Sequence, residues 1–107
     1  MKITNYEAEA TLLGAILVEG TLFNDLELEE EHFYDARHRR IFRAMKEVFE
    51  KKQPIDIVII QIRSLLTMPY LQPQYIHEVH HRYVQDRFFL NEYYRYLERL
   101  IKNALAV

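Results

Sequence analysis

The pattern His-Glu-x-x-His at residues 77–81 is the part of the sequence that most directly suggests catalysis. On a helix, His77 and His81 would share one face and could bind a zinc ion, with Glu78 as the general base. A working site also needs an open position for water and a third ligand, for which Glu92 and Glu98 are candidates. Exposed or partner-facing histidines are the commoner explanation. We therefore expect no metal site, and a small zinc hydrolase is the enzymatic alternative.

A second candidate site is the basic patch formed by Arg37, Arg39, Arg40 and Arg43. Arginine clusters contact phosphates, so the patch is a possible weak DNA contact. However, acidic neighbours surround it, and the chain carries 16 acidic against 14 basic residues, for a net charge of −2. Dedicated nucleic-acid binders are usually basic. We therefore expect DNA to bind at most weakly, and the patch to be a solvated or ion-paired face.

Composition excludes several other functions. Gly14 and Gly20 are the only glycines among the 107 residues, so no phosphate loop exists and the chain is not a P-loop ATPase. The lack of cysteine excludes disulfides and thiolate chemistry. No apolar run approaches the roughly 20 residues of a membrane span, and the N-terminus lacks a signal-peptide pattern. We expect a cytoplasmic protein without membrane contact.

The elements that must position these residues are predicted to be helices. Thr4 and Glu7 have the spacing of a capping box, and apolar residues recur after them at helical period. Gly20 could take the left-handed conformation that ends this first helix. Residues 21–26 predict a short second helix. The acidic run at residues 27–31 predicts a solvated loop or helix edge.

The clearest helix begins after Asp35, a good N-cap, and ends before Pro54, which cannot continue it. Its apolar residues fall on one stripe: Ile41, Phe42, Met45, Val48 and Phe49.

Residues 55–62 contain a run of four β-branched side chains at positions 57–60, and propensity alone would favour a strand there. A lone strand without a partner is not viable, and nothing else in the chain resembles one. We therefore predict a helix capped by Asp56, with Ile57, Ile60 and Ser64 on one side.

Pro73 suits the first position of a further helix, and Asp86 caps the last one. Residues 86–107 reach the end of the sequence without a stop signal, which indicates a longer helix that was cut or an end that packs against a partner. The overall prediction is an all-α bundle of about six helices in a single domain, residues 1–107.

Three segments resemble the N-terminal domain of bacterial and phage replicative helicases of the DnaB type. Residues 7–17, EAEATLLGAIL, are similar to that family's E-A-E-x-x-L-L-G-A-L-L. Residues 33–45, FYDARHRRIFRAM, are close to F-Y-D-x-R-H-x-x-I-F-x-A-M, and P-I-D follows at residues 54–56. Residues 92–94 match the E-Y-Y that opens the family's helical hairpin. The order and spacing agree along nearly the whole chain, except at residues 68–73, where the family usually has Gly-Gly.

The resemblance implies a helical head without catalytic activity, followed by a hairpin whose first helix is residues 86–107. In such helicases six heads form a collar that binds the C-terminal domain of primase and, in many systems, a helicase loader. ATP and magnesium would be used by a motor domain that this chain lacks. The resemblance also implies a helix at residues 57–66 and a non-catalytic role for Glu78. The helicase-binding C-terminal domain of a primase, which is similar in fold, is the nearest alternative.

The expected partner surface rests on tyrosine and on the last helix. Tyr75 occupies the family's tyrosine position. If Ile76 and Val79 face the core, Tyr75 is rotated by about 100° from Ile76 and should be partly exposed. We expect it to bind primase or a loader, because interface energy concentrates in aromatic anchors. Further partner-binding residues, which include the expected self-association surface, are predicted on the last helix: Tyr93, Tyr94, Leu97, Ile101 and Leu105.

Overall fold

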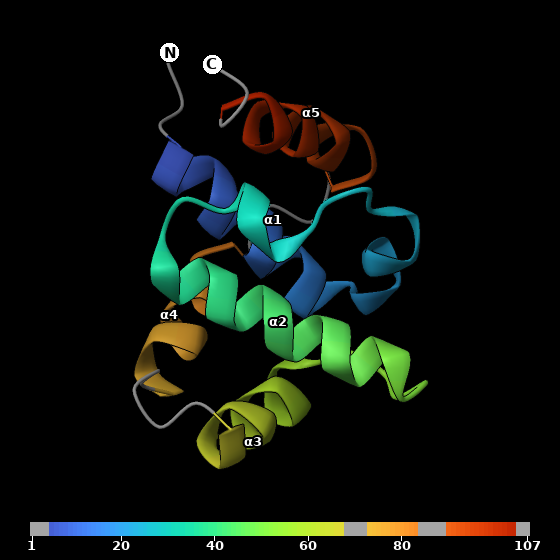
Figure 1. Cartoon of the computed structure of the whole chain (residues 1–107), viewed down its shortest axis with the longest axis vertical. Helices are drawn as coiled ribbons and strands as arrows, with labels where there is room; N and C mark the ends of the chain where they lie inside the picture. The colour runs from blue at the N-terminus through green and yellow to red at the C-terminus, as the bar shows by residue number, and fades with distance from the viewer. Residues whose placement is uncertain (1–4, 68–72, 84–89, 105–107) are drawn as a thin grey trace.

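The computed structural model describes residues 5–67, 73–83 and 90–104, which form helices joined by short connections (Figure 1). In chain order they are α1 (Asn5–Val18), the 3₁₀ segments η1 (Gly20–Asp25) and η2 (Glu30–His32), α2 (Ala36–Glu50), α3 (Ile57–Thr67), α4 (Pro73–Tyr83) and α5 (Leu90–Ala104). No strand occurs within these ranges. The predicted all-α bundle is therefore confirmed. The expected caps at Thr4 and Asp86 lie outside the described residues.

Helix α1 lies at the centre of the bundle because it is apolar on nearly every side. It packs against α2, α4 and α5, and nine of its 14 residues are buried, including Leu12, Leu13 and Ile16. A helix that is hydrophobic all round must be covered all round. The other helices are therefore arranged about α1, with α5 above it and α3 at the far end in Figure 1.

Helix α2 begins where the sequence predicts. The Asp35 side chain accepts a hydrogen bond from the Arg37 backbone N–H at 2.8 Å, which satisfies one free donor of the first turn. Four of the five predicted stripe residues are buried, but Phe49 is 42% exposed at the end of the helix. Its ring packs against Phe23 of η1 in a tilted arrangement, with ring centroids 5.0 Å apart.

Helix α3 confirms that tertiary context outweighs β-propensity here. Asp56 caps it by accepting a hydrogen bond from the Ile59 backbone N–H at 2.9 Å. Ile60 and Ser64 are fully buried on the face that packs against α2 and α4. The Ser64 hydroxyl has no hydrogen-bond partner there, so α3 buries one polar group without compensation.

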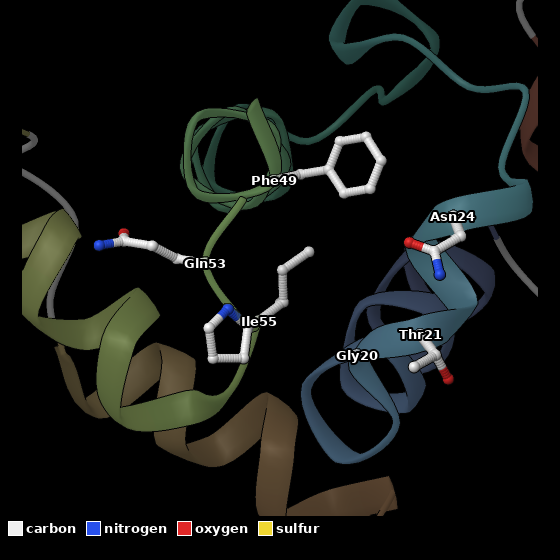
Figure 2. Close-up of a pocket in the computed structure, with 7 residues that line it drawn as sticks. Gly20, Thr21, Asn24, Phe49, Gln53 and Ile55 are labelled. Atoms are coloured by element: carbon white, nitrogen blue, oxygen red, sulfur yellow. The ribbon is translucent and has the colours of Figure 1, made fainter. Parts of the chain in front are cut away.

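The role predicted for Gly20 is wrong. Helix α1 ends at Val18, and no glycine in the described ranges has a positive φ. Gly20 begins η1 instead, and a Cβ atom there would lie 2.3 Å from the Ile55 carbonyl oxygen. Glycine is therefore needed for a close approach of two backbones, beside the shallow hollow in Figure 2. The left-handed residue is Lys52, with φ 58°, just after α2.

Candidate functional site

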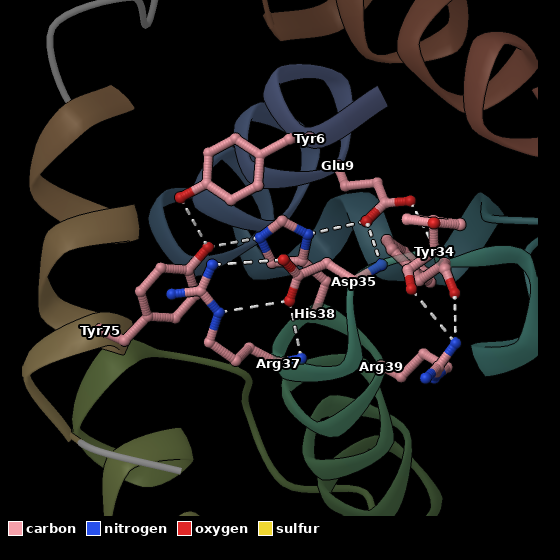
Figure 3. Close-up of polar contacts among 9 residues, drawn as sticks. Tyr6, Glu9, Tyr34, Asp35, Arg37, His38, Arg39 and Tyr75 are labelled. Carbon is pink, nitrogen blue, oxygen red and sulfur yellow. Dashed lines mark hydrogen bonds and ion pairs between the residues drawn. The ribbon is translucent and has the colours of Figure 1, made fainter. Parts of the chain in front are cut away.

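A buried polar network joins the two motif segments of the sequence. Glu9 of α1 and His38 of α2 are 2% and 0% exposed, and Glu9 Oε1 lies 2.8 Å from His38 Nδ1. Glu9 also accepts hydrogen bonds from the backbone N–H groups of Tyr34, at 2.6 Å, and Asp35, at 3.2 Å. One carboxylate thus holds the His38 imidazole and the chain entering α2 (Figure 3).

The network continues to α4 through Tyr75. The Tyr75 hydroxyl lies 2.5 Å from His38 Nε2 and 3.0 Å from the Tyr6 hydroxyl. Because Tyr75 has one hydroxyl proton, two arrangements satisfy every group. If Tyr75 donates to Tyr6, His38 is a cation that donates at both nitrogens; if Tyr75 donates to His38, the imidazole is neutral and Tyr6 donates to Tyr75. Burial, followed by the hydrogen bond with Tyr6, raises the pKa of Tyr75, so its phenol stays protonated.

The expected exposure of Tyr75 is wrong. Its side chain retains 8% of its accessible surface, because α4 packs against both α1 and α3. The neighbouring side chain that reaches solvent is that of Arg37. Its guanidinium lies 4.0 Å from the centroid of the Tyr75 ring, which is a cation–π contact. The side chain of Arg37 remains 46% exposed.

Arg37 is also paired with Asp35. Its guanidinium donates to the Asp35 carboxylate at 3.2 and 3.3 Å. Burial alone would raise the pKa of Asp35, but the hydrogen bonds from Arg37 outweigh it, and the pKa is lowered from its ordinary value. The same pairing raises the pKa of Arg37.

The rest of the basic patch is largely engaged within the molecule. Arg39 donates to the carbonyl oxygens of Phe33 and Tyr34, at 3.2 and 3.3 Å. Arg43 forms a two-pronged pair with Glu30, at 2.7 and 2.8 Å, which lowers the pKa of that carboxyl. Lys46 makes a single ion pair with Glu29, the residue just before η2. The acidic run is therefore an ion-paired surface as well as a solvated one.

His77 and His81 share a face of α4, as the spacing requires. Their rings stack with centroids 6.2 Å apart, and both side chains are exposed beside Glu78. Glu98 lies elsewhere: it is 9% exposed and accepts a hydrogen bond from the Glu27 backbone N–H at 2.8 Å, which ties α5 to the loop before η2. The side chain of Glu92 is outside the described set. Within that set, no three potential ligands lie together as a metal site would require.

The expected self-association surface on the last helix is wrong for two of its residues. Leu97 and Ile101 are 1% and 2% exposed, because α5 buries its apolar face against α1. Leu105 and the side chains of Tyr93 and Tyr94 lie outside the described set, so the prediction for these three is untested.

Sequence reasoning missed the role of Glu9 and His38. Both lie on the apolar face of their predicted helices. His38 precedes Ile41 and Phe42 by three and four positions, and Glu9 precedes Leu12 and Leu13 by the same spacing. Polar residues at core positions are normally hydrogen-bonded to one another, and this was the available signal.

The chain is similar in sequence to the N-terminal part of replicative DNA helicases. The family model described as DnaB-like helicase N terminal domain matches residues 1–99. The replicative DNA helicase DnaB of Rickettsia conorii is 38% identical over 66 residues, which are 60% of this chain and 13% of that protein. The DnaB of Rhodothermus marinus is 43% identical over 56 residues, or 50% of this chain and 6% of that protein.

A relative with another printed name also matches. The probable HTH-type transcriptional regulator YttP of Bacillus subtilis is 33% identical over 91 residues, 80% of this chain and 44% of that protein. The chain thus spans less than half the length of each of these three relatives. No solved structure matches the chain significantly. In the described ranges, no helix is long and apolar enough to cross a bilayer.

Proposed function

This chain belongs to the family of DnaB-like helicase N-terminal domains, and on that premise we propose that it is the docking head of a replicative DNA helicase. In this role it associates with other helicase subunits and binds the C-terminal domain of primase or a helicase loader, in the cytoplasm. It catalyses no reaction itself. ATP and magnesium act in the motor part of the parent protein.

The observation that carries the proposal is that the motif residues are used internally. Glu9 and His38 bind each other and the neighbouring backbone, and Asp35 caps α2 while pairing with Arg37. A reactive centre needs polar groups that face an open cavity. Here they fix the angles between α1, α2 and α4, so the motifs support a rigid frame for docking. The family match likewise favours the helicase over the primase alternative.

The outer side of this frame offers the partner-facing residues that we propose in place of Tyr75. Tyr34 is 72% exposed, and Arg37 projects from the first turn of α2 on the same frame (Figure 3). Tyrosine and arginine are the side chains that most often anchor protein interfaces. The guanidinium carbon of Arg37 lies 4.0 Å from the centroid of the Tyr75 ring and 5.8 Å from that of the Tyr6 ring, so both rings contact the guanidinium and help to orient it.

A competition assay tests the proposal. The 107-residue chain in excess should displace primase from the assembled parent helicase and reduce helicase-stimulated primer synthesis. The double variant Tyr34→Ala, Arg37→Ala should compete at least tenfold less well while remaining folded, with only the small loss of stability expected from removing the half-exposed Arg37–Asp35 pair. Glu78→Ala, on the far exposed face of α4, is the control and should compete like the wild type. Failure of the wild-type chain to displace primase at any concentration would refute the proposal.

A further inference from the structure

Three cations of α2 form a row along one face of the helix. Arg39, Arg43 and Lys46 are spaced by four and three residues, so they stand above one another at successive turns. We call them the cation row. Cations repeated along a helix are the usual partners of the repeated negative charges of a phosphate backbone.

An acidic segment of the same chain, residues 29–31, occupies this row. Glu30 accepts two hydrogen bonds from the Arg43 guanidinium, at 2.7 and 2.8 Å. Glu29 forms an ion pair with Lys46. Two of the three charges in the row are therefore already neutralised by carboxylates.

The acidic segment is held by these charges and not by packing. None of the residues of η2 is buried, and the side chains of the two ion pairs are between 34 and 53% exposed. Leu28 and Phe33, on either side of the segment, are buried and anchor the chain to the core. Exposed ion pairs contribute little to stability and are screened by salt. The segment can therefore leave the row while the head stays folded.

Two groups beside the row indicate which ligand it fits. Arg40, three residues before Arg43, makes no hydrogen bond or ion pair with the residues that the structure describes. Tyr34 is 72% exposed, and its carbonyl oxygen accepts a hydrogen bond from Arg39, so it lies at one end of the row (Figure 3). Cations beside an exposed aromatic ring bind single-stranded nucleic acids, with phosphates on the cations and a base stacked on the ring. An acidic peptide would leave the ring unused.

We propose that the cation row binds the backbone of a single nucleic-acid strand, and that the acidic segment is its internal competitor. Phosphates can displace the carboxylates because the strand releases its condensed counterions when it binds, and this gain favours the exchange. While the segment is in place, Arg40 is the arginine that a strand can reach without breaking a contact, so the wild-type chain binds weakly. The inference goes beyond the docking function and does not depend on it.

Removal of the competitor tests the proposal. The probe is a fluorescent oligothymidylate of about 12 nucleotides, whose anisotropy is followed over a range of salt concentrations. Glu29→Gln with Glu30→Gln should bind it at least tenfold more tightly than the wild type. The slope of log K against log salt concentration should steepen by about 1.4, because Arg43 and Lys46 each become available to one phosphate. A double variant that binds no more tightly than the wild type would overturn the proposal.

The matched control is Glu19→Gln with Glu78→Gln, which removes the same charge from two exposed glutamates outside the segment. It should change the affinity less than threefold, and a gain equal to that of the first double variant would overturn the proposal, since net charge alone would then explain both. Adding Tyr34→Ala to the first double variant should weaken binding of oligothymidylate but not of linear polyphosphate, which has no bases. A gain for polyglutamate in place of oligothymidylate would assign the row to an acidic protein segment and overturn the nucleic-acid assignment. Failure to bind primase would refute the docking function and leave this inference intact.

Discussion

Replacing Glu9 by alanine should cost more stability than any other single change at a carboxylate in the described chain. The substitution leaves three donors without their acceptor: the backbone N–H groups of Tyr34 and Asp35, and His38 Nδ1. An unsatisfied buried donor costs about 1–3 kcal/mol. Water can reach the two partly buried backbone groups, but His38 is fully buried. We therefore expect the free energy of unfolding to fall by about 3–5 kcal/mol, as when one member of a buried pair is removed.

Urea unfolding followed by far-ultraviolet circular dichroism measures this loss. The urea midpoint should fall by about 2 M. Glu78→Ala is the matched control, since it removes an exposed helical glutamate and should change the free energy of unfolding by less than about 0.5 kcal/mol. Glu9→Gln should lie between the two, because its amide keeps one acceptor oxygen. A loss below about 1 kcal/mol for Glu9→Ala, or an equal loss for Glu78→Ala, would refute the network as the frame of the head.

Three further predictions concern local features. Ser64→Ala should raise the free energy of unfolding by about 1 kcal/mol in urea titrations, because it removes a buried hydroxyl without a partner; a loss of similar size would show that the hydroxyl is bonded. Lys52→Gly should raise it by about 0.5–1 kcal/mol, because glycine adopts the left-handed conformation without strain; thermal unfolding that is unchanged or earlier would contradict this. Finally, folding lowers the pKa values of Asp35 and Glu30, so their ionised carboxylates stabilise the folded state. This stabilisation is complete above the unfolded pKa values of about 4, and it is lost as the pH falls through the lower pKa values of the folded state. Asp35→Asn should flatten that acid limb of the stability–pH curve, and an unchanged acid limb would refute the pairing with Arg37.

The helices were predictable because their signals are local. Asp35 and Asp56 cap their helices as the sequence indicates, and the apolar stripe of α2 is buried apart from Phe49. Such features depend on residues within one or two turns of each other. The strand-like composition of residues 55–62 did not produce a strand, because the part of the chain that the structure describes contains no other strand to pair with it.

The site was less predictable because its contacts are remote in sequence. His38 meets Glu9 across 29 positions and Tyr75 across 37. The exposure predicted for Tyr75 assumed that α4 buries one narrow stripe, but α4 packs against two helices and buries a wider face. Leu97 and Ile101 were assigned to a partner for a similar reason: periodicity shows that a helix has an apolar face, and not which surface covers it. Here α1, apolar on all sides, provides that cover.

Isothermal titration of the 107-residue chain with the C-terminal domain of the primase from the same genome tests the docking function most directly. We expect saturable one-to-one binding that is weakened at least tenfold by Tyr34→Ala with Arg37→Ala and unchanged by Glu78→Ala. The absence of binding between the two folded proteins would contradict it. So would tight, salt-resistant binding of DNA by the chain alone, which would instead favour a role like that named for its regulator relative.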